Sequence, residues 1–154
     1  MPRASGLIPL SHDHHHGLRL AQLIKKNAPK YSDLPESIQD KAKYTIEFYY
    51  SDLLKHFSSE EEILYPFVKG VDESVDRLFK EIIEEHRQIR EQIEIMEKES
   101  LKDTPALEDR LDELGRLLDS HIRKEERELF PRIEAVLDKE KLQELNGKIN
   151  PVKK

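Results

Sequence analysis

The sequence has no cysteine, no long apolar run and almost no pattern typical of β-strands. The missing cysteine excludes disulfides, iron–sulfur clusters held by thiolates and thiol chemistry. A membrane-spanning helix needs roughly 20 consecutive apolar residues, and no such run is present. An excess of positive charge is missing too, because the net charge is -6 and the pI is about 5.7. We therefore expect neither a nucleic-acid nor an anionic-membrane partner.

The chain has 154 residues, a length that suits one domain with a sizeable core. Charged residues make up 38% of it, which is typical of helices with heavily solvated outer faces. The first ten residues are too short and too weakly apolar for a secretory signal, so we expect a cytoplasmic protein.

Apolar residues recur with helical spacing in four long segments. Ser11 is a candidate N-terminal cap for the first segment. Thr104, which is followed by Pro105, is a candidate cap for the fourth segment. A short helix follows Pro131, and Asp138 is expected to cap another that ends at Gly147. The tail, residues 150–154, is expected to fray. The predicted long helices cover residues 11–27, 35–65, 73–99 and 105–130.

Four amphipathic helices with short connections predict an all-α fold, an antiparallel up-and-down four-helix bundle with a short C-terminal helical extension. We expect an irregular segment over residues 1–9, the bundle over residues 10–137, and a short helix and tail over residues 138–154.

An eleven-residue pattern, His-x-x-x-Glu-Glu-x-x-Leu-aromatic-Pro, occurs twice, starting at His56 and at His121. On a helix, residues four apart lie one above the other, so each copy directs an imidazole and a carboxylate to one point. The leucine one turn further on keeps that face apolar and turned inward. The final proline, Pro66 or Pro131, predicts a helix stop, because proline lacks the amide donor and clashes with the preceding turn. The two copies supply half of a buried metal site: His56, Glu60, His121 and Glu125.

The first and third helices should each supply one more histidine. The third has only His86, which lies on its apolar stripe. In the first helix His14 copies those surroundings, with a leucine four residues before it and another four after it, whereas polar residues flank His15 and His16. We predict His14 as the ligand, with His15 as the alternative. The interrupted His-Asp-His-His-His run leads directly into a helical pattern, which argues against an expression tag.

Four imidazoles and two carboxylates without a thiolate suit iron or manganese. Six ligands are too many for one tetrahedral zinc, but they suit two metals bridged by the two carboxylates. Glu61 and Glu126, five residues after the motif histidines, are alternative carboxylates if they are not solvated charges. Tyr49 should pack beneath the metals. The predicted ligands are His14, His56, Glu60, His86, His121 and Glu125.

With these motifs the chain resembles the hemerythrin-like family, the HHE cation-binding domains, over residues 8–135. The resemblance implies a four-helix bundle around a non-haem diiron centre. Family members carry or sense oxygen, handle nitric oxide, sense iron or serve in stress responses. The matching residues are Asp13-His14, His56 and Glu60 with Leu64-Tyr65-Pro66, Glu85-His86, and His121 and Glu125 with Leu129-Phe130-Pro131.

The chain departs from the oxygen carriers of this family at the third helix. They have two histidines one turn apart there, whereas Ile82 and Arg90 flank His86 at that spacing. The departure argues against reversible oxygen carriage and predicts a weaker second site, partly occupied or holding manganese or zinc. Members that repair iron–sulfur clusters carry a cysteine-bearing segment, and this chain has no cysteine.

The leading hypothesis is a non-enzymatic protein with two iron ions that binds or senses O2, NO or iron itself. The first alternative is a diiron oxidase or peroxidase, for which the sequence shows no dedicated substrate motif. The second is a helical interaction module with a structural metal. Exchangeable ligands on the metal would separate the first two hypotheses from the third, and turnover with oxygen or peroxide would separate the first two from each other.

Overall fold

The computed structural model describes residues 3–99 and 105–149, and within these ranges all regular structure is helical. The prediction of an all-α bundle is confirmed. No helix in the described ranges is both long and apolar enough to cross a membrane. The α-helices are α1 (Ile8–Ile24), α2 (Ile38–Phe48), α3 (Leu54–Ser59), α4 (Tyr65–Val68), α5 (Glu73–Lys98), α6 (Pro105–Lys124), α7 (Phe130–Val136) and α8 (Lys139–Ile149).

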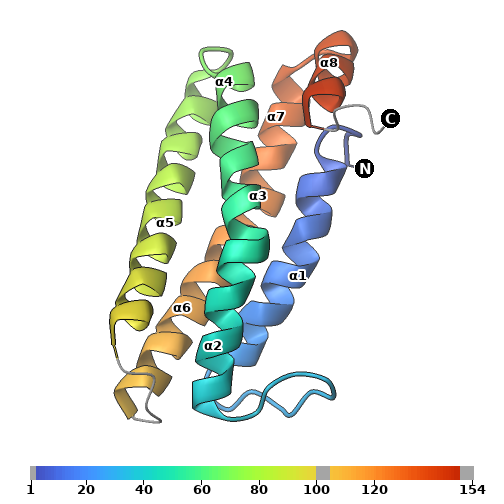
Figure 1. The fold of residues 1–154 in the computed structure, drawn as a ribbon. Helices are drawn as coiled ribbons and strands as arrows, with labels where there is room; N and C mark the ends of the chain where they lie inside the picture. Colours follow the sequence, from blue (N-terminus) through green and yellow to red (C-terminus); the bar gives the residue numbers. More distant parts are fainter. Residues whose placement is uncertain (1–2, 100–104, 150–154) are drawn as a thin grey trace.

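Four long rods form the bundle, because π-helical turns join several of these helices end to end. The turns Tyr49–Leu53 and Glu60–Leu64 link α2, α3 and α4 into one rod, and the turn Glu125–Leu129 links α6 to α7. Successive rods run in opposite directions along the bundle, and the short helix α8 folds back beside the start of α1 (Figure 1). The N-terminal segment and α8 therefore close the same end of the molecule.

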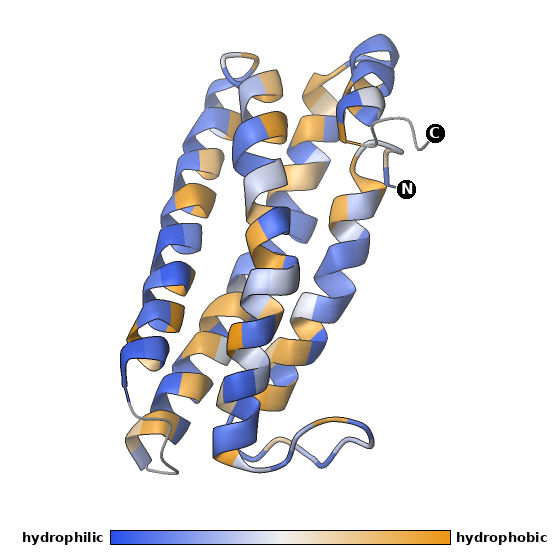
Figure 2. Cartoon of the chain, viewed as in Figure 1, coloured by the Kyte–Doolittle hydropathy of each residue, from blue (hydrophilic) through white to orange (hydrophobic). Residues whose placement is uncertain are grey.

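The core consists of two apolar clusters, one towards each end of the bundle. One cluster includes Leu10, Phe79 and Phe130 and also contains Leu145 of α8, and the other includes Leu20 and Ile93. Apolar residues lie along the inward sides of the rods and polar residues along the outward sides (Figure 2). The layer between the two clusters holds the buried histidine and glutamate side chains.

Several helix ends differ from the sequence prediction. Helix α1 begins at Ile8 and not at Ser11, since Pro9 suits a first helical turn. Helix α2 begins after Ser37, whose side chain accepts a hydrogen bond from the backbone N–H of Asp40, and not at Pro35. Asp72 caps α5, since its carboxylate accepts a hydrogen bond from the backbone N–H of Val75. The expected cap Thr104 and the tail lie outside the described residues.

Asp138 caps α8, as predicted, by accepting a hydrogen bond from the backbone N–H of Lys141 at 2.8 Å. The helix then continues through Gly147 to Ile149. The expected end at Gly147 is therefore wrong by two residues, because glycine weakens a helix without interrupting its hydrogen bonds.

Pro66 and Pro131 do not end their helices, so that prediction is wrong. A π-helical turn comes directly before the residue that precedes each proline, and the helix continues beyond it as α4 or α7. The N–H of Tyr65 bonds to the carbonyl of Glu60, five residues back in place of four. The wider turn makes room for the proline ring. Because proline has no N–H group, one carbonyl of the preceding turn receives no helical hydrogen bond from it.

Helices α1 and α6 approach closely at Gly115. A Cβ atom added there would lie 2.7 Å from the backbone oxygen of Ala21 and 3.0 Å from a side-chain carbon of Ile24. A main-chain oxygen cannot move aside without shifting the helix, so only glycine permits this contact.

We predict that Gly115→Ala lowers the free energy of unfolding by about 1–3 kcal/mol, because it forces the two helices apart. Urea denaturation measures this change. Gly147→Ala is the matched control, since a Cβ atom at that exposed position of α8 meets nothing within 4 Å. Equal denaturation midpoints for the two variants would contradict this account of the helix contact.

Candidate metal centre

The six predicted ligands lie in the polar layer between the two apolar clusters. His14 is on α1, His86 on α5, and His56 and His121 are on the two rods that carry the repeated motif. Glu60 and Glu125 are the first residues of their π-helical turns, a kind of turn that is frequent at functional sites. All six side chains are buried, and none is more than 4% exposed. His15, the alternative to His14, is exposed, and so is His16.

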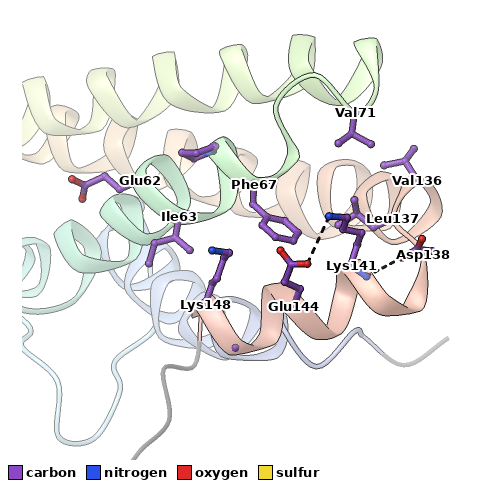
Figure 3. A pocket seen from close by; sticks show the side chains of 12 residues that line it. Glu62, Ile63, Phe67, Val71, Val136, Leu137, Asp138, Lys141, Glu144 and Lys148 are labelled. Atoms are coloured by element: carbon purple, nitrogen blue, oxygen red, sulfur yellow. Dashed lines mark hydrogen bonds and ion pairs between the residues drawn. The ribbon is translucent and has the colours of Figure 1, made fainter.

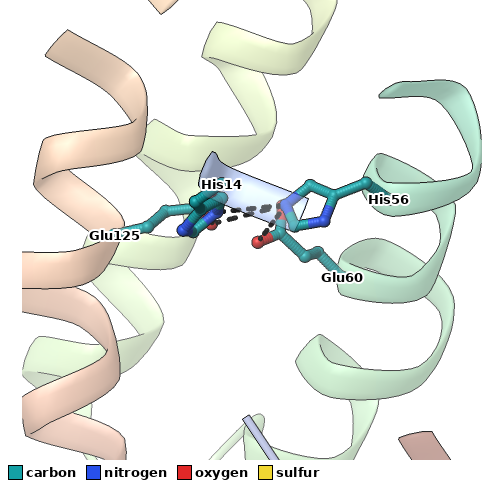
Figure 4. Close-up of side chains that lie close together, drawn as sticks. All are labelled: His14, His56, Glu60 and Glu125. Carbon is teal, nitrogen blue, oxygen red and sulfur yellow. Dashed lines mark hydrogen bonds and ion pairs between the residues drawn. The ribbon is translucent and has the colours of Figure 1, made fainter. Parts of the chain in front are cut away.

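One group of four contains His14, His56, Glu60 and Glu125 (Figure 4). The Nε2 atom of His14 lies 3.1 Å from Nε2 of His56 and 2.9 Å from Oε1 of Glu125. The Nε2 atom of His56 lies 3.2 Å from Oε2 of Glu60. One atom from each of the four residues faces a common point, within 4.8 Å of the others.

The second group contains His86, His121 and the same two carboxylates. The Nε2 atom of His86 lies 3.0 Å from Oε1 of Glu60, and Nε2 of His121 lies 2.8 Å from Oε2 of Glu125. Each carboxylate therefore turns one oxygen towards the first pair of histidines and the other oxygen towards the second pair.

The atoms of this layer are close together but poorly matched as hydrogen-bond partners. Both oxygens of Glu60, one oxygen of Glu125 and the Nε2 atoms of His86 and His121 are buried without a hydrogen bond in the described structure. Unpaired buried polar atoms are costly, whereas nitrogen and oxygen lone pairs that converge on one point are what a cation requires. The side chains of this layer therefore fit a bound metal ion.

The electrostatics of the layer also favour a cation. Burial lowers the pKa of His14, but hydrogen bonds to Glu125 and Glu126 outweigh it and bring the pKa to about 9. The pKa of His56 and that of His86 are likewise raised well above the usual value, against the effect of burial, by nearby carboxylates. Protons on these imidazoles compensate the buried negative charge, a role that a metal ion takes over when the protons leave.

Each of the four histidines also has a carboxylate at its Nδ1 atom. His14 pairs with Glu126 at 2.5 Å, His56 with Asp13 at 3.1 Å, His86 with Glu61 at 2.6 Å and His121 with Glu85 at 2.7 Å. Such a partner accepts a hydrogen bond from the Nδ1–H group. The proton then stays on Nδ1, and the lone pair of Nε2 points to the centre. Every pair joins two different rods.

Glu61 and Glu126, which the sequence left open as alternative metal carboxylates or solvated charges, orient histidines instead, and Glu85 does the same. A side chain turned about 100° from the centre of a bundle points to the neighbouring helix and not to solvent, so these residues reach the histidines there. A sequence signal was present, because all four orienting carboxylates are direct neighbours of a predicted ligand: Asp13-His14, Glu60-Glu61, Glu85-His86 and Glu125-Glu126.

Two of the imidazoles have an aromatic ring stacked on one face. Phe57 stacks on His86 with ring centroids 4.0 Å apart, and Phe130 lies parallel to His14 at 5.5 Å. Tyr49 is buried and packs against Phe57, in agreement with the expectation that it lies beneath the site. These contacts restrict rotation of the rings about their side-chain bonds.

Two cavities differ sharply in size and in their relation to this layer. A cavity of about 10 Å³ is lined by His14, His56 and His121 together with apolar residues such as Ile122. A groove of about 890 Å³ lies between α8 and the rod that contains α4, and none of the six predicted ligands lines it (Figure 3). The small cavity suits a molecule about as large as water, whereas a third pocket, of about 250 Å³, is lined by His86 together with Glu61 and Arg90.

We predict that Glu85→Ala weakens metal binding by about 10–100-fold, since it frees the imidazole of His121 to turn away. Competition with a chelator of known affinity measures the change. Glu84→Ala is the matched control, because this neighbour on α5 is exposed and, within residues 3–99 and 105–149, its side chain bonds to Arg87 and Gln88 and to no histidine. Equal affinities for the two variants would show that the carboxylate does not orient the histidine.

Comparison with known proteins agrees with this geometry. A family model described as the hemerythrin HHE cation binding domain matches residues 7–133, which is most of the chain. Searches of curated proteins and of solved structures found no match. The matched range contains both repeated motifs and both groups of four converging residues. The chain belongs to the hemerythrin HHE cation-binding domain family.

Proposed function

We propose that this protein holds two iron ions and binds or senses a small diatomic molecule, O2 or NO. His14 and His56 are the terminal ligands of one ion, and His86 and His121 those of the other. The observation that carries the proposal is that both groups of four share Glu60 and Glu125. Two carboxylates that each face both histidine pairs suit two bridged ions better than one.

The donor set supports iron over zinc. Imidazole and carboxylate ligands suit iron or manganese, and a structural zinc site is closed by four ligands in a tetrahedron. Here two histidines and two shared carboxylates per ion leave room for a further ligand. When bound there, ferrous iron supplies the electrons and the free coordination position that O2 or NO requires.

The small cavity supports a diatomic ligand. Its volume of about 10 Å³ admits a molecule close to water in size, and its walls include His14 and His56. Apolar side chains such as Leu118 and Ile122 form other parts of the wall, beside the carboxylates of Asp13 and Asp52. An organic substrate of an oxidase would need a larger space against several ligands; the groove of about 890 Å³ touches none of the six, and the pocket of about 250 Å³ touches His86 alone among them.

Gly17 and Ile122 set the width of this cavity on the side where α1 meets α6. Both residues line it, and a Cβ atom added at Gly17 would lie 2.8 Å from the Cδ1 methyl of Ile122. That methyl is the flexible end of a side chain, so it can move into the free space beside it.

We predict that Glu60→Ala and Glu125→Ala each remove both ions, whereas His86→Ala retains one, because only the carboxylates face both histidine pairs. The parent protein should hold about two irons per chain after reconstitution, and elemental analysis of identically purified variants gives the ratio. Glu62→Ala, at an exposed position of the same π-helical turn as Glu60, should leave the iron content unchanged. One tightly held zinc per chain, unaffected by added iron, would contradict the proposal.

We predict that Gly17→Ala weakens the binding of NO to the iron-loaded protein about tenfold or more without loss of iron, because the displaced methyl of Ile122 narrows the cavity. Titration followed by the visible spectrum measures the affinity. The double variant Gly17→Ala with Ile122→Val lacks the methyl that clashes and should recover the parent affinity. Unchanged NO affinity in Gly17→Ala would mean that the ligand reaches the centre by another path.

A further inference from the structure

The segment before α1 is fixed to the rest of the molecule through Arg3. Its guanidinium donates to Oε1 of Glu134 at 2.9 Å and to Oε1 of Glu126 at 3.1 Å. The other oxygen of Glu134 accepts a hydrogen bond from the backbone N–H of Ala4 at 2.6 Å. The side chains of Arg3, Glu126 and Glu134 are all less than 30% exposed. Several charge-assisted hydrogen bonds in a half-buried place hold a side chain more firmly than one surface ion pair does.

Glu126 links Arg3 directly to the candidate metal centre. One of its oxygens faces Arg3, and the other lies 2.5 Å from Nδ1 of His14. Arg3 also donates to the backbone carbonyl of Glu126, at 3.0 Å. Because the guanidinium contacts both the side chain and the main chain of Glu126, the carboxylate cannot turn away from His14 without losing these bonds.

A second path joins the same residues through a ring. The guanidinium carbon of Arg3 lies 5.5 Å from the ring centroid of Phe130, and the other ring contact of Phe130 is His14, with an interplanar angle of 13°. Guanidinium over an aromatic face is a favourable arrangement. Arg3 therefore holds both the carboxylate at the edge of the His14 imidazole and the phenyl ring that lies along its face.

The matching position in the other half of the bundle lacks this support. Glu61 holds His86 as Glu126 holds His14, and both follow a shared carboxylate directly in sequence. Among the described residues, however, no arginine or lysine forms an ion pair with Glu61, whose side chain is 36% exposed. Two halves with the same candidate ligands thus differ in what fixes the orienting carboxylate.

We propose that Arg3 is a positioning residue for the ion that His14 and His56 hold, and that it acts through Glu126. This inference rests on the proposed function. By fixing Glu126, Arg3 keeps the His14 imidazole in the orientation that presents Nε2 to the centre. Loss of Arg3 leaves the six ligands in place but frees this imidazole to rotate. Release of the ion held by His14 then becomes faster, and release of the other ion does not.

The test measures the release of ferrous iron to a chelator that forms a coloured complex. Arg3→Met is made in His86→Ala, which retains the ion held by His14, and in His14→Ala, which retains the other ion. We expect release at least about tenfold faster in the first background, the lower end of the usual effect of such outer partners, and no change in the second. Equal acceleration in both backgrounds would mean a general loss of stability and would overturn the proposal.

A double-mutant cycle tests the route through Glu126. In a Glu126→Gln background, Arg3→Met should cause little further change in release, whereas in a Glu134→Gln background it should still accelerate release. Additive effects of Arg3→Met and Glu126→Gln would overturn the proposed route. The zinc-loaded protein gives a readout independent of iron, because the NMR signal of the His14 Nδ1 proton should broaden or shift in Arg3→Met.

Lys124→Met is the mirror-image control. Lys124 bonds to Glu85 at 2.6 Å, and Glu85 orients His121 in the other half. This substitution should accelerate release of the ion held by His86 and His121 and leave the ion held by His14 unaffected. Release of fewer than two ions per parent chain would contradict the proposed function, while the Arg3 comparison still holds for the ion that His14 retains.

Discussion

Two carboxylates with no solvent exposure, Glu60 and Glu125, require compensating positive charge in the interior of the bundle. They lie between two apolar clusters that offer no compensation for negative charge. Burial of an uncompensated carboxylate costs far more than one packing contact contributes, so the surroundings must supply positive charge. Four imidazoles from four rods meet that need with protons, and a metal ion meets it without them. The bundle therefore has to keep all four rods in register at this layer.

The orienting carboxylates turn this layer into a closed ring. Asp13 on α1 holds His56, Glu61 on the same rod as His56 holds a histidine on α5, Glu85 on α5 holds one on α6, and Glu126 beyond α6 returns to α1. Each rod thus carries a candidate ligand and, next to it, the residue that orients a ligand of another rod. A shift of one rod would disturb two histidines at once, which couples the register of the four rods to the geometry of the centre.

Local periodicity was enough to predict the all-α fold and the set of residues that meets between the rods. Residues four apart share a face on any regular helix, so the pairing of His56 with Glu60 needs no tertiary knowledge. The prediction that helices end at Pro66 and Pro131 was wrong, because π-helical turns carry the helices past these prolines. The hydrogen bonds that form such turns leave no pattern in the sequence. The role of Arg3 could not be predicted for another reason: its partners lie on other elements, and only the packing of the bundle shows which neighbour a charged side chain meets.

The difference between the two halves arises outside the candidate ligands. Each half has two histidines and shares both carboxylates, so the ligand chemistry alone would make the two proposed ions alike. On the side of His14, Arg3 joins the orienting carboxylate of Glu126 to the segment before α1, whereas on the other side Lys124 of α6 pairs with Glu85, the orienting carboxylate of His121. On the side of His86, the ring of Phe57 covers the imidazole at 4.0 Å. Free space is present on both sides, because the cavity of about 10 Å³ is lined by His14, His56 and His121 and a pocket of about 250 Å³ is lined by His86. What distinguishes the two halves is therefore the element to which each orienting carboxylate is anchored.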